Sequence, residues 1–193
     1  MTPGPFVEPP WAEPLDVART LAGIPDSARI AGMFFLALQE GAERRQATLG
    51  FPKARYLPFG FYPVREFAPL LVEAAGKFYP GLSLREGLRR IGTAGPVAFL
   101  SSTLGKVTLG ASEGVHATVA AIAKTYGINT RPSRCEILHA GPRSMTLTLD
   151  DVVYFLDSHH VGVFEGTLHY AGVDGRVKIA ARSETSAELL LEW

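Results

Sequence analysis

The stretch VVYFLDSHHVGVFEGTLHYAG, residues 152–172, decides how the chain is expected to fold. Its opening run, VVYFL, is apolar with β-branched and aromatic members, which predicts a strand buried on both faces. Asp157 and Ser158 then offer side-chain oxygens to the free N–H groups of a helix start. Apolar side chains recur every three or four positions after them, and Gly172 is a typical stop. We therefore expect a buried strand followed by a helix over 158–171.

Two glycines interrupt the expected helix. Gly162 and Gly166 are one turn apart on the same side of a helix, and each costs about 1 kcal/mol relative to alanine in a helix interior. A glycine in such a place permits a close approach that a methyl group would prevent. The approaching group is a neighbouring element of the fold, a ligand or a partner, and packing is the simplest interpretation.

Composition limits the class of protein. With 193 residues, 47% of them hydrophobic, the chain is long enough for one sizeable core. The 19 basic and 19 acidic side chains cancel, so we expect no nucleic-acid partner. No apolar run reaches the roughly 18 residues of a membrane span. The single cysteine, Cys135, excludes an internal disulfide, and no signal-peptide pattern opens the chain, which favours a cytoplasmic protein.

The first part of the chain is predicted to be an arm followed by helices. Residues 1–27 form a Pro-rich N-terminal arm, and a single α+β domain is expected over 28–193. The segment 51–63 is rich in proline and aromatic residues, which indicates a connection packed on the core. Gly92 and Pro96 predict that one helix ends and a new segment, 96–111, begins. Amphipathic patterns predict helices that start at Met33 and over 64–79, 84–92 and 115–126.

The second part is predicted to be a sheet. Alternation with period two over 134–139 and 144–149, around the turn 140–143, predicts a hairpin. Two more strands are expected over 176–182 and 187–192. With the buried strand and the glycine-faced helix, the order becomes β-β-β-α-β-β. The predicted fold class is α+β, with a helical N-terminal part followed by an antiparallel sheet of about four to five strands.

Histidines gather in and around the organising helix. His159, His160 and His169 carry ring nitrogens that are able to bind zinc or iron. The H-E-x-x-H spacing is absent, and the adjacent His159 and His160 point about 100° apart on a helix. The three are therefore weak metal candidates. The simplest interpretation has one first-turn ring partly buried and the other in water, with Glu165 paired to His169.

The sequence contains no catalytic signature. The P-loop pattern and the G-x-S-x-G elbow are both absent, so no catalytic residue is assigned. An aromatic connection beside a glycine-faced helix favours a non-enzymatic sensory or adaptor module for an apolar small molecule or a protein partner. The residues expected to take part are His159, Gly162, Gly166, His169, Phe59, Phe61 and Tyr62. The alternative is a metal- or haem-dependent sensor or enzyme that uses His159, His160 and His169. No cofactor is required, and a homodimer is one option.

Several motifs resemble those of a known family. They are G-M-F-F at 32–35, Y-P-V-R-E at 62–66, LREGLRRIG at 84–92, FLDSHHVGVFEGTL at 155–168 and the closing Trp193. Together they resemble an uncharacterised, largely Myxococcales-restricted family without an assigned activity. The resemblance covers residues 28–193, and the helix motif with its E-G pair is its most specific part.

The order of elements is similar to a fold shared by haem nitric-oxide-binding domains, vinyl-4-reductase-type domains and Bet3-type trafficking subunits. In that fold, helices precede a sheet and an apolar ligand pocket is enclosed, so the resemblance implies such a pocket here. The haem-binding branch carries a Y-x-S-x-R motif for the haem propionates. None of the 6 tyrosines of this chain begins that motif.

Overall fold

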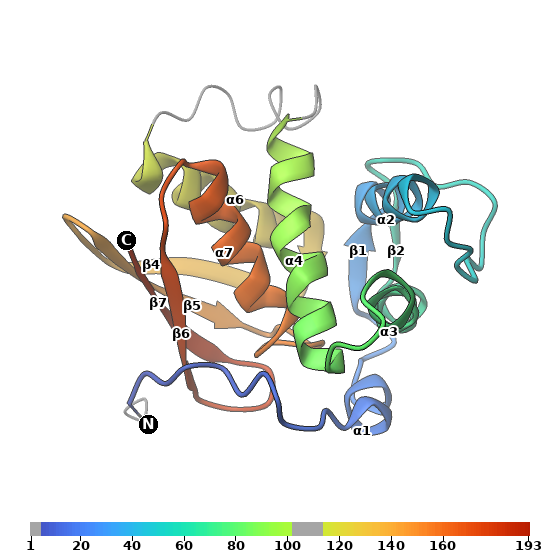
Figure 1. Cartoon of the computed structure of the whole chain (residues 1–193), viewed down its shortest axis with the longest axis horizontal. Coiled ribbons are helices and arrows are strands. Elements are labelled where there is room, and N and C mark those ends of the chain that lie inside the picture. The colour runs from blue at the N-terminus through green and yellow to red at the C-terminus, as the bar shows by residue number, and fades with distance from the viewer. Residues whose placement is uncertain (1–4, 102–113) are drawn as a thin grey trace.

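The computed structural model describes residues 5–101 and 114–193, which form two parts side by side (Figure 1). The N-terminal part holds a short helix, two longer helices and two short strands: α1 (Val17–Ala22), β1 (Arg29–Ala31), α2 (Gly32–Arg44), β2 (Phe61–Pro63) and α3 (Val64–Phe78). The C-terminal part consists of α4 (Leu84–Ser101), α6 (Val115–Asn129), β3 (Thr130–Arg131), β4 (Arg134–Gly141), β5 (Ser144–Asp150), α7 (His159–Tyr170), β6 (Arg176–Ala181) and β7 (Ala187–Glu192). None of the described helices is long and apolar enough to cross a bilayer.

The larger sheet has 4 antiparallel strands in the order β4-β5-β7-β6. Its hairpin β4–β5 and the pair β6–β7 confirm the strands predicted from period-two alternation. Alternate residues of β5, such as Leu147 and Leu149, are fully buried. They share one core with Val119 and Ile122 of α6 and Phe164 of α7, so the helices pack on one face of this sheet. The predicted α+β class is confirmed.

A second sheet was not predicted. Its 3 short strands, in the order β2-β1-β3, join the two parts of the molecule, because β3 follows α6 while β1 precedes α2. Ile30 pairs with Tyr62 on one side and with Thr130 on the other. Strands of 2 or 3 residues are too short to show a period in the sequence.

The predicted strand 152–156 is wrong. This apolar run forms a buried loop, in which Val152 is 0% and Phe155 2% exposed. Asp151 and Phe155 have φ angles of 56° and 43°, which an extended strand does not allow. In addition, β5 already lies between β4 and β7, so Val152 instead donates its N–H to the carbonyl of Thr185 at 2.8 Å. The observed order is β-β-α-β-β.

Two predicted helix ends are also wrong. Helix α4 continues through Gly92 and Pro96 to Ser101, and α6 continues past Gly127 to Asn129. Gly92 lies where another helix approaches: a Cβ built on it would be 2.0 Å from the carbonyl oxygen of His159. This glycine therefore serves close packing within a helix, not helix termination. Of the predicted segment 96–111, residues 102–111 lie outside the described residues.

Helix α7 confirms the predicted helix and lies against α4 (Figure 1). A Cβ at Gly162 would be 2.1 Å from the carbonyl oxygen of Arg89, and one at Gly166 would be 2.1 Å from that of Thr93. From Gly162 to Gly166 on α7, and from Arg89 to Thr93 on α4, the chain advances by one helical turn in the same direction. The two helices therefore run parallel, and their backbones are in contact. The glycine-faced side of α7 is thus its contact with α4.

The predicted side-chain cap of α7 is wrong. Ser158 makes no side-chain bond to the helix start, and its hydroxyl donates to the carbonyl of Phe155 at 3.4 Å. The carboxylate of Asp157 pairs instead with the guanidinium of Arg85 on α4. This ion pair adds a second link between α4 and the start of α7.

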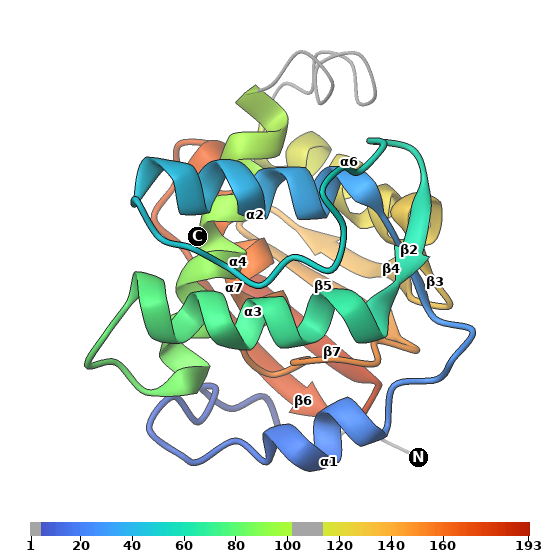
Figure 2. The same cartoon turned by 90° about the vertical axis from the view of Figure 1, so that its right-hand side faces the viewer.

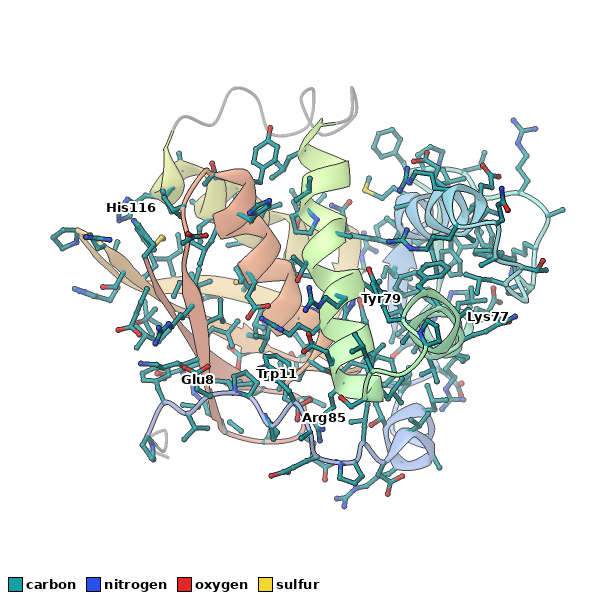
Figure 3. The ribbon with its side chains drawn as sticks, in the orientation of Figure 1. Glu8, Trp11, Lys77, Tyr79, Arg85 and His116 are labelled. Carbon is teal, nitrogen blue, oxygen red and sulfur yellow. The ribbon has the colours of Figure 1, made fainter. Side chains whose placement is uncertain are left out.

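The N-terminal arm packs on the C-terminal part. Val7 pairs with Ile179 of the edge strand β6, and the Trp11 ring lies 4.6 Å from the guanidinium carbon of Arg89. Figure 3 shows Trp11 and Arg85 close together where the arm passes α4, and Arg85 donates to the Glu13 carbonyl at 3.1 Å. The arm also contains helix α1.

Candidate ligand-binding site

A cavity of about 310 Å³ lies between the two parts of the molecule. Helices α2 and α3 form one wall, and α4, α6 and α7 form the other. In Figure 2, α2 and α3 run across the front of the molecule with α4 behind them. Most of the lining is apolar: it includes Met33, Phe34, Leu38, Phe67, Leu71, Phe78, Ile91, Pro96, Phe99, Ile122 and Val163.

The cavity exists because each part has its own hydrophobic core. Phe35 and Leu71 belong to the core of the N-terminal part, and Leu88, near the start of α4, joins that core. Further along α4 the lining residue Gly95 is exposed, and a Cβ built on it would meet no heavy atom within 4 Å. The two parts are therefore in contact at the start of α4 and leave space beside its second half.

Two buried nitrogen atoms of the lining have no hydrogen-bond partner. Asn129 is only 5% exposed, and its Nδ2 is unsatisfied, as is Nδ1 of His159. The nearby Thr125 hydroxyl, by contrast, donates to the carbonyl of Ile122 at 2.6 Å. Because buried polar groups almost always have partners, these two nitrogens are candidate contacts for a bound molecule.

His160 is buried and His159 is half-buried, so neither ring lies in water, which corrects the prediction that one of them does. Burial lowers the pKa of His159 to about 4, although a hydrogen bond with the Leu88 backbone opposes this shift. Burial, and then the neighbouring His159, lower the pKa of His160 well below its usual range. The His160 Nδ1 lies 3.0 Å from the hydroxyl of Tyr126, behind the cavity wall. Both rings are therefore neutral at pH 7.

The end of α2 contributes positive charge. Arg44 and Arg45 both line the cavity and are exposed. Arg44 lies 3.7 Å from the carboxylate of Glu40. Arg45 donates to the Gly41 carbonyl and the Tyr79 hydroxyl, at 3.3 Å each, and its guanidinium lies over the Phe78 ring. Figure 3 shows Tyr79 between α3 and α4. In the part of the chain that the structure describes, Arg45 has no carboxylate partner.

The structure brings only one of the sequence-predicted site residues, His159, to the cavity. Gly162 and Gly166 face α4, and His169 is exposed near the far end of α7. The expected partner of His169, Glu165, is instead bound by Arg89, with its Oε2 at 2.6 Å from Nε.

The aromatic residues of the connection 51–63 that were predicted to bind a ligand do not line the cavity. Phe59 and Phe61 are 65% and 38% exposed. Tyr62 packs in the core of the N-terminal part, with ring centroids 5.0 Å from Tyr56 and 5.7 Å from Phe35. Of this segment, the lining includes Pro58. Sequence reasoning also missed Gly95, Asn129 and Arg45, which no motif marks.

Comparison with protein families gives one match over most of the chain. The family model described as a protein of unknown function, DUF2378, matches residues 25–193. The chain belongs to this family. A comparison with curated proteins finds no match.

Solved structures of H-NOX proteins share the fold. The ferrous, unliganded H-NOX protein from K. algicida superposes with a TM-score of 0.59 and 11% identity, over 84% of this chain and 96% of that one. The ferrous nitric-oxide complex of an H-NOX protein from S. oneidensis gives 0.56 and 13%, over 84% and 98%. At such low identity the likeness shows the fold, and it confirms the expected similarity to haem nitric-oxide-binding domains.

Proposed function

We propose that the protein is a non-enzymatic sensory module that holds an apolar small molecule in the cavity between α2 and α4. The observation that carries this proposal is the apolar cavity of about 310 Å³ with two unsatisfied buried nitrogens. Ligand sites typically have volumes of roughly 300 to 1,000 Å³, apolar walls and a few placed polar groups. A bound ligand would change the position of the N-terminal part relative to α4, and a signalling partner would respond to that change.

The fold supports this proposal as an analogy. The solved structures that resemble this chain include an H-NOX protein in its Fe(II)NO state and one from a study of haem distortion in the H-NOX family, and the shared fold is compatible with small-molecule sensing. We further propose a cytoplasmic location and action through a protein partner or a homodimer. The net charge of zero continues to argue against nucleic acid as the partner.

Native mass spectrometry of freshly purified protein tests the proposal, because a ligand adds mass to the folded chain. We expect an adduct on the parent protein and its loss from Gly95→Leu, whose side chain would occupy the open space beside α4. Gly76→Leu is the matched control, since Gly76 is also a helix glycine with an open Cβ direction but lies outside the cavity lining. A bare mass for the parent protein, or an adduct that persists in Gly95→Leu, would contradict the proposal.

A haem- or metal-dependent sensor is the second candidate, and the position of His159 on the cavity is the observation in its favour. A haem iron needs an axial ligand such as an imidazole nitrogen that faces it. Nδ1 of His159 is the unsatisfied imidazole nitrogen on the cavity, but no tyrosine of the chain begins the Y-x-S-x-R motif that holds the haem propionates. His160 and His169 do not line the cavity. No group of three metal-binding side chains occurs among the described residues. As arranged, these residues do not fit haem or a metal ion.

An absorbance titration separates the two candidates. We expect that one equivalent of added haemin produces no protein-bound Soret band and that metal analysis of the purified protein finds no stoichiometric metal. A sharp Soret band at one equivalent that His159→Leu abolishes would favour the haem sensor over the apolar-ligand module.

A further inference from the structure

We propose that the ligand of the cavity is an elongated apolar carboxylate whose acid group binds Arg45 and whose far end offers a hydrogen-bond acceptor to Asn129. This inference rests on the proposed function and specifies the ligand class for the same cavity. It follows from the positions of the charged and polar groups along the cavity wall.

Arg45 has the properties of an anchor for an acid group. It directly follows α2 as the C-cap residue, lines the cavity and is exposed, so an incoming ligand meets it without a large desolvation cost. Its bonds to the Gly41 carbonyl and the Tyr79 hydroxyl, together with the Phe78 ring below it, hold the guanidinium in place. None of these partners neutralises the charge. A guanidinium that is fixed but not neutralised favours a carboxylate, which it binds by charge-assisted hydrogen bonds.

Asn129 lies at the opposite end of α2. It directly precedes Thr130, which pairs with Ile30 just before α2 begins, whereas Arg45 follows the last residue of α2. The lining of the cavity extends along α2 from Met33 to Arg44, which corresponds to about 16 Å at 1.5 Å per residue. The ligand is therefore long and narrow, with one polar group at each end.

The ligand group at the inner end of the cavity has to be a hydrogen-bond acceptor. Nδ2 of Asn129 is an N–H donor that lies buried without a partner, and only an acceptor on the ligand would satisfy it. The walls between the two ends are apolar, with Leu38, Leu71 and Ile91 among the residues that line them. Hydrocarbon between two polar ends is the ligand chemistry that matches this order.

Isothermal titration calorimetry with three probes tests the inference: 12-hydroxydodecanoate, dodecanoate and dodecan-1-ol. We expect 12-hydroxydodecanoate to bind the parent protein most tightly and dodecan-1-ol about tenfold more weakly, the size of one charge-assisted contact. Arg45→Gln should remove the preference for the two carboxylates over the alcohol. The control Arg176→Gln, on the far strand β6, should keep it.

The acceptor at the far end is tested separately. Asn129→Leu, which removes the unsatisfied donor, should abolish the preference for 12-hydroxydodecanoate over dodecanoate and leave the dependence on Arg45 intact. Equal affinities of the acid and the alcohol, or an Arg45→Gln variant that retains the preference, would overturn the inference. So would the absence of binding by all three probes. Native mass spectrometry judges the proposed function independently, because an uncharged apolar adduct would uphold the cavity as a ligand site while rejecting the acid group.

Discussion

Gly166→Leu is expected to lower the free energy of unfolding by about 3 kcal/mol or more, because overpacking a closed contact costs roughly that much. A Cβ at this position would be only 2.1 Å from the carbonyl oxygen of Thr93, so α4 and α7 have to move apart. Gly166→Ala already introduces this atom and should lose most of the same stability. At 2 to 4 °C for each kcal/mol, the melting temperature should fall by about 6 to 12 °C.

The control for this experiment is Gly76→Ala on α3. A Cβ there meets no heavy atom within 4 Å, so the substitution should gain about 0.5 to 1 kcal/mol from helix propensity alone. Opposite signs for two Gly→Ala changes in helix interiors would separate the steric effect from propensity. The close-packing interpretation fails if Gly166→Ala melts within a degree of the parent protein.

The close packing at the glycines of α7 was predictable, because a glycine in a helix interior lowers helix stability and is expected where it permits a close contact. Strands β5 and β6 of the larger sheet were predictable because buried apolar residues recur at every second position, as at Leu147 and Leu149 or at Val177 and Ile179. Strand β4 has no buried residue, and the turn residues at 140–143 mark it as one half of a hairpin. The run 152–156 shows where this reasoning stops, since a buried loop and a buried strand require the same apolar residues. Only the positive φ angles of Asp151 and Phe155, set by the surrounding fold, distinguish the two. Gly92 presents the converse problem, because a glycine that permits close packing looks the same in sequence as a helix stop.

The candidate site was much less predictable than the fold. Its walls come from α2 and α4, which are distant in sequence, and the space between them is a property of how two cores meet. His159 was predicted as a site residue because histidine is able to bind metal ions. Its position on the cavity depends on the tertiary structure, which the local sequence does not show. Arg45 and Asn129 are single polar residues at helix ends, where such residues are common, so no local pattern distinguishes them.

The histidine pair supplies the second large effect, a loss of stability in weak acid. His159 has a pKa of about 4 in the folded protein, and that of His160 is also depressed, whereas an unfolded histidine titrates near 6.5. Between these values the unfolded chain binds more protons than the folded one. The stabilising contribution is therefore complete above about pH 6.5 and is lost as the pH falls towards 4. For His159 alone the loss corresponds to about 2 kcal/mol at pH 5.

Urea unfolding at pH 7.5 and pH 5 measures this effect. The parent protein should lose several kcal/mol between the two conditions, and His159→Leu should lose about 2 kcal/mol less, because the variant no longer has this proton to bind on unfolding. The buried rings of Tyr154 and Tyr126 face the pair and do not titrate in this range, since burial raises the pKa of both. His169→Gln, at an exposed position on the same helix, should keep the full pH dependence of the parent. If His159→Leu loses as much stability as the parent protein, His159 does not titrate as a buried neutral ring, and the acid sensitivity has to come from the carboxylates of the ion pairs.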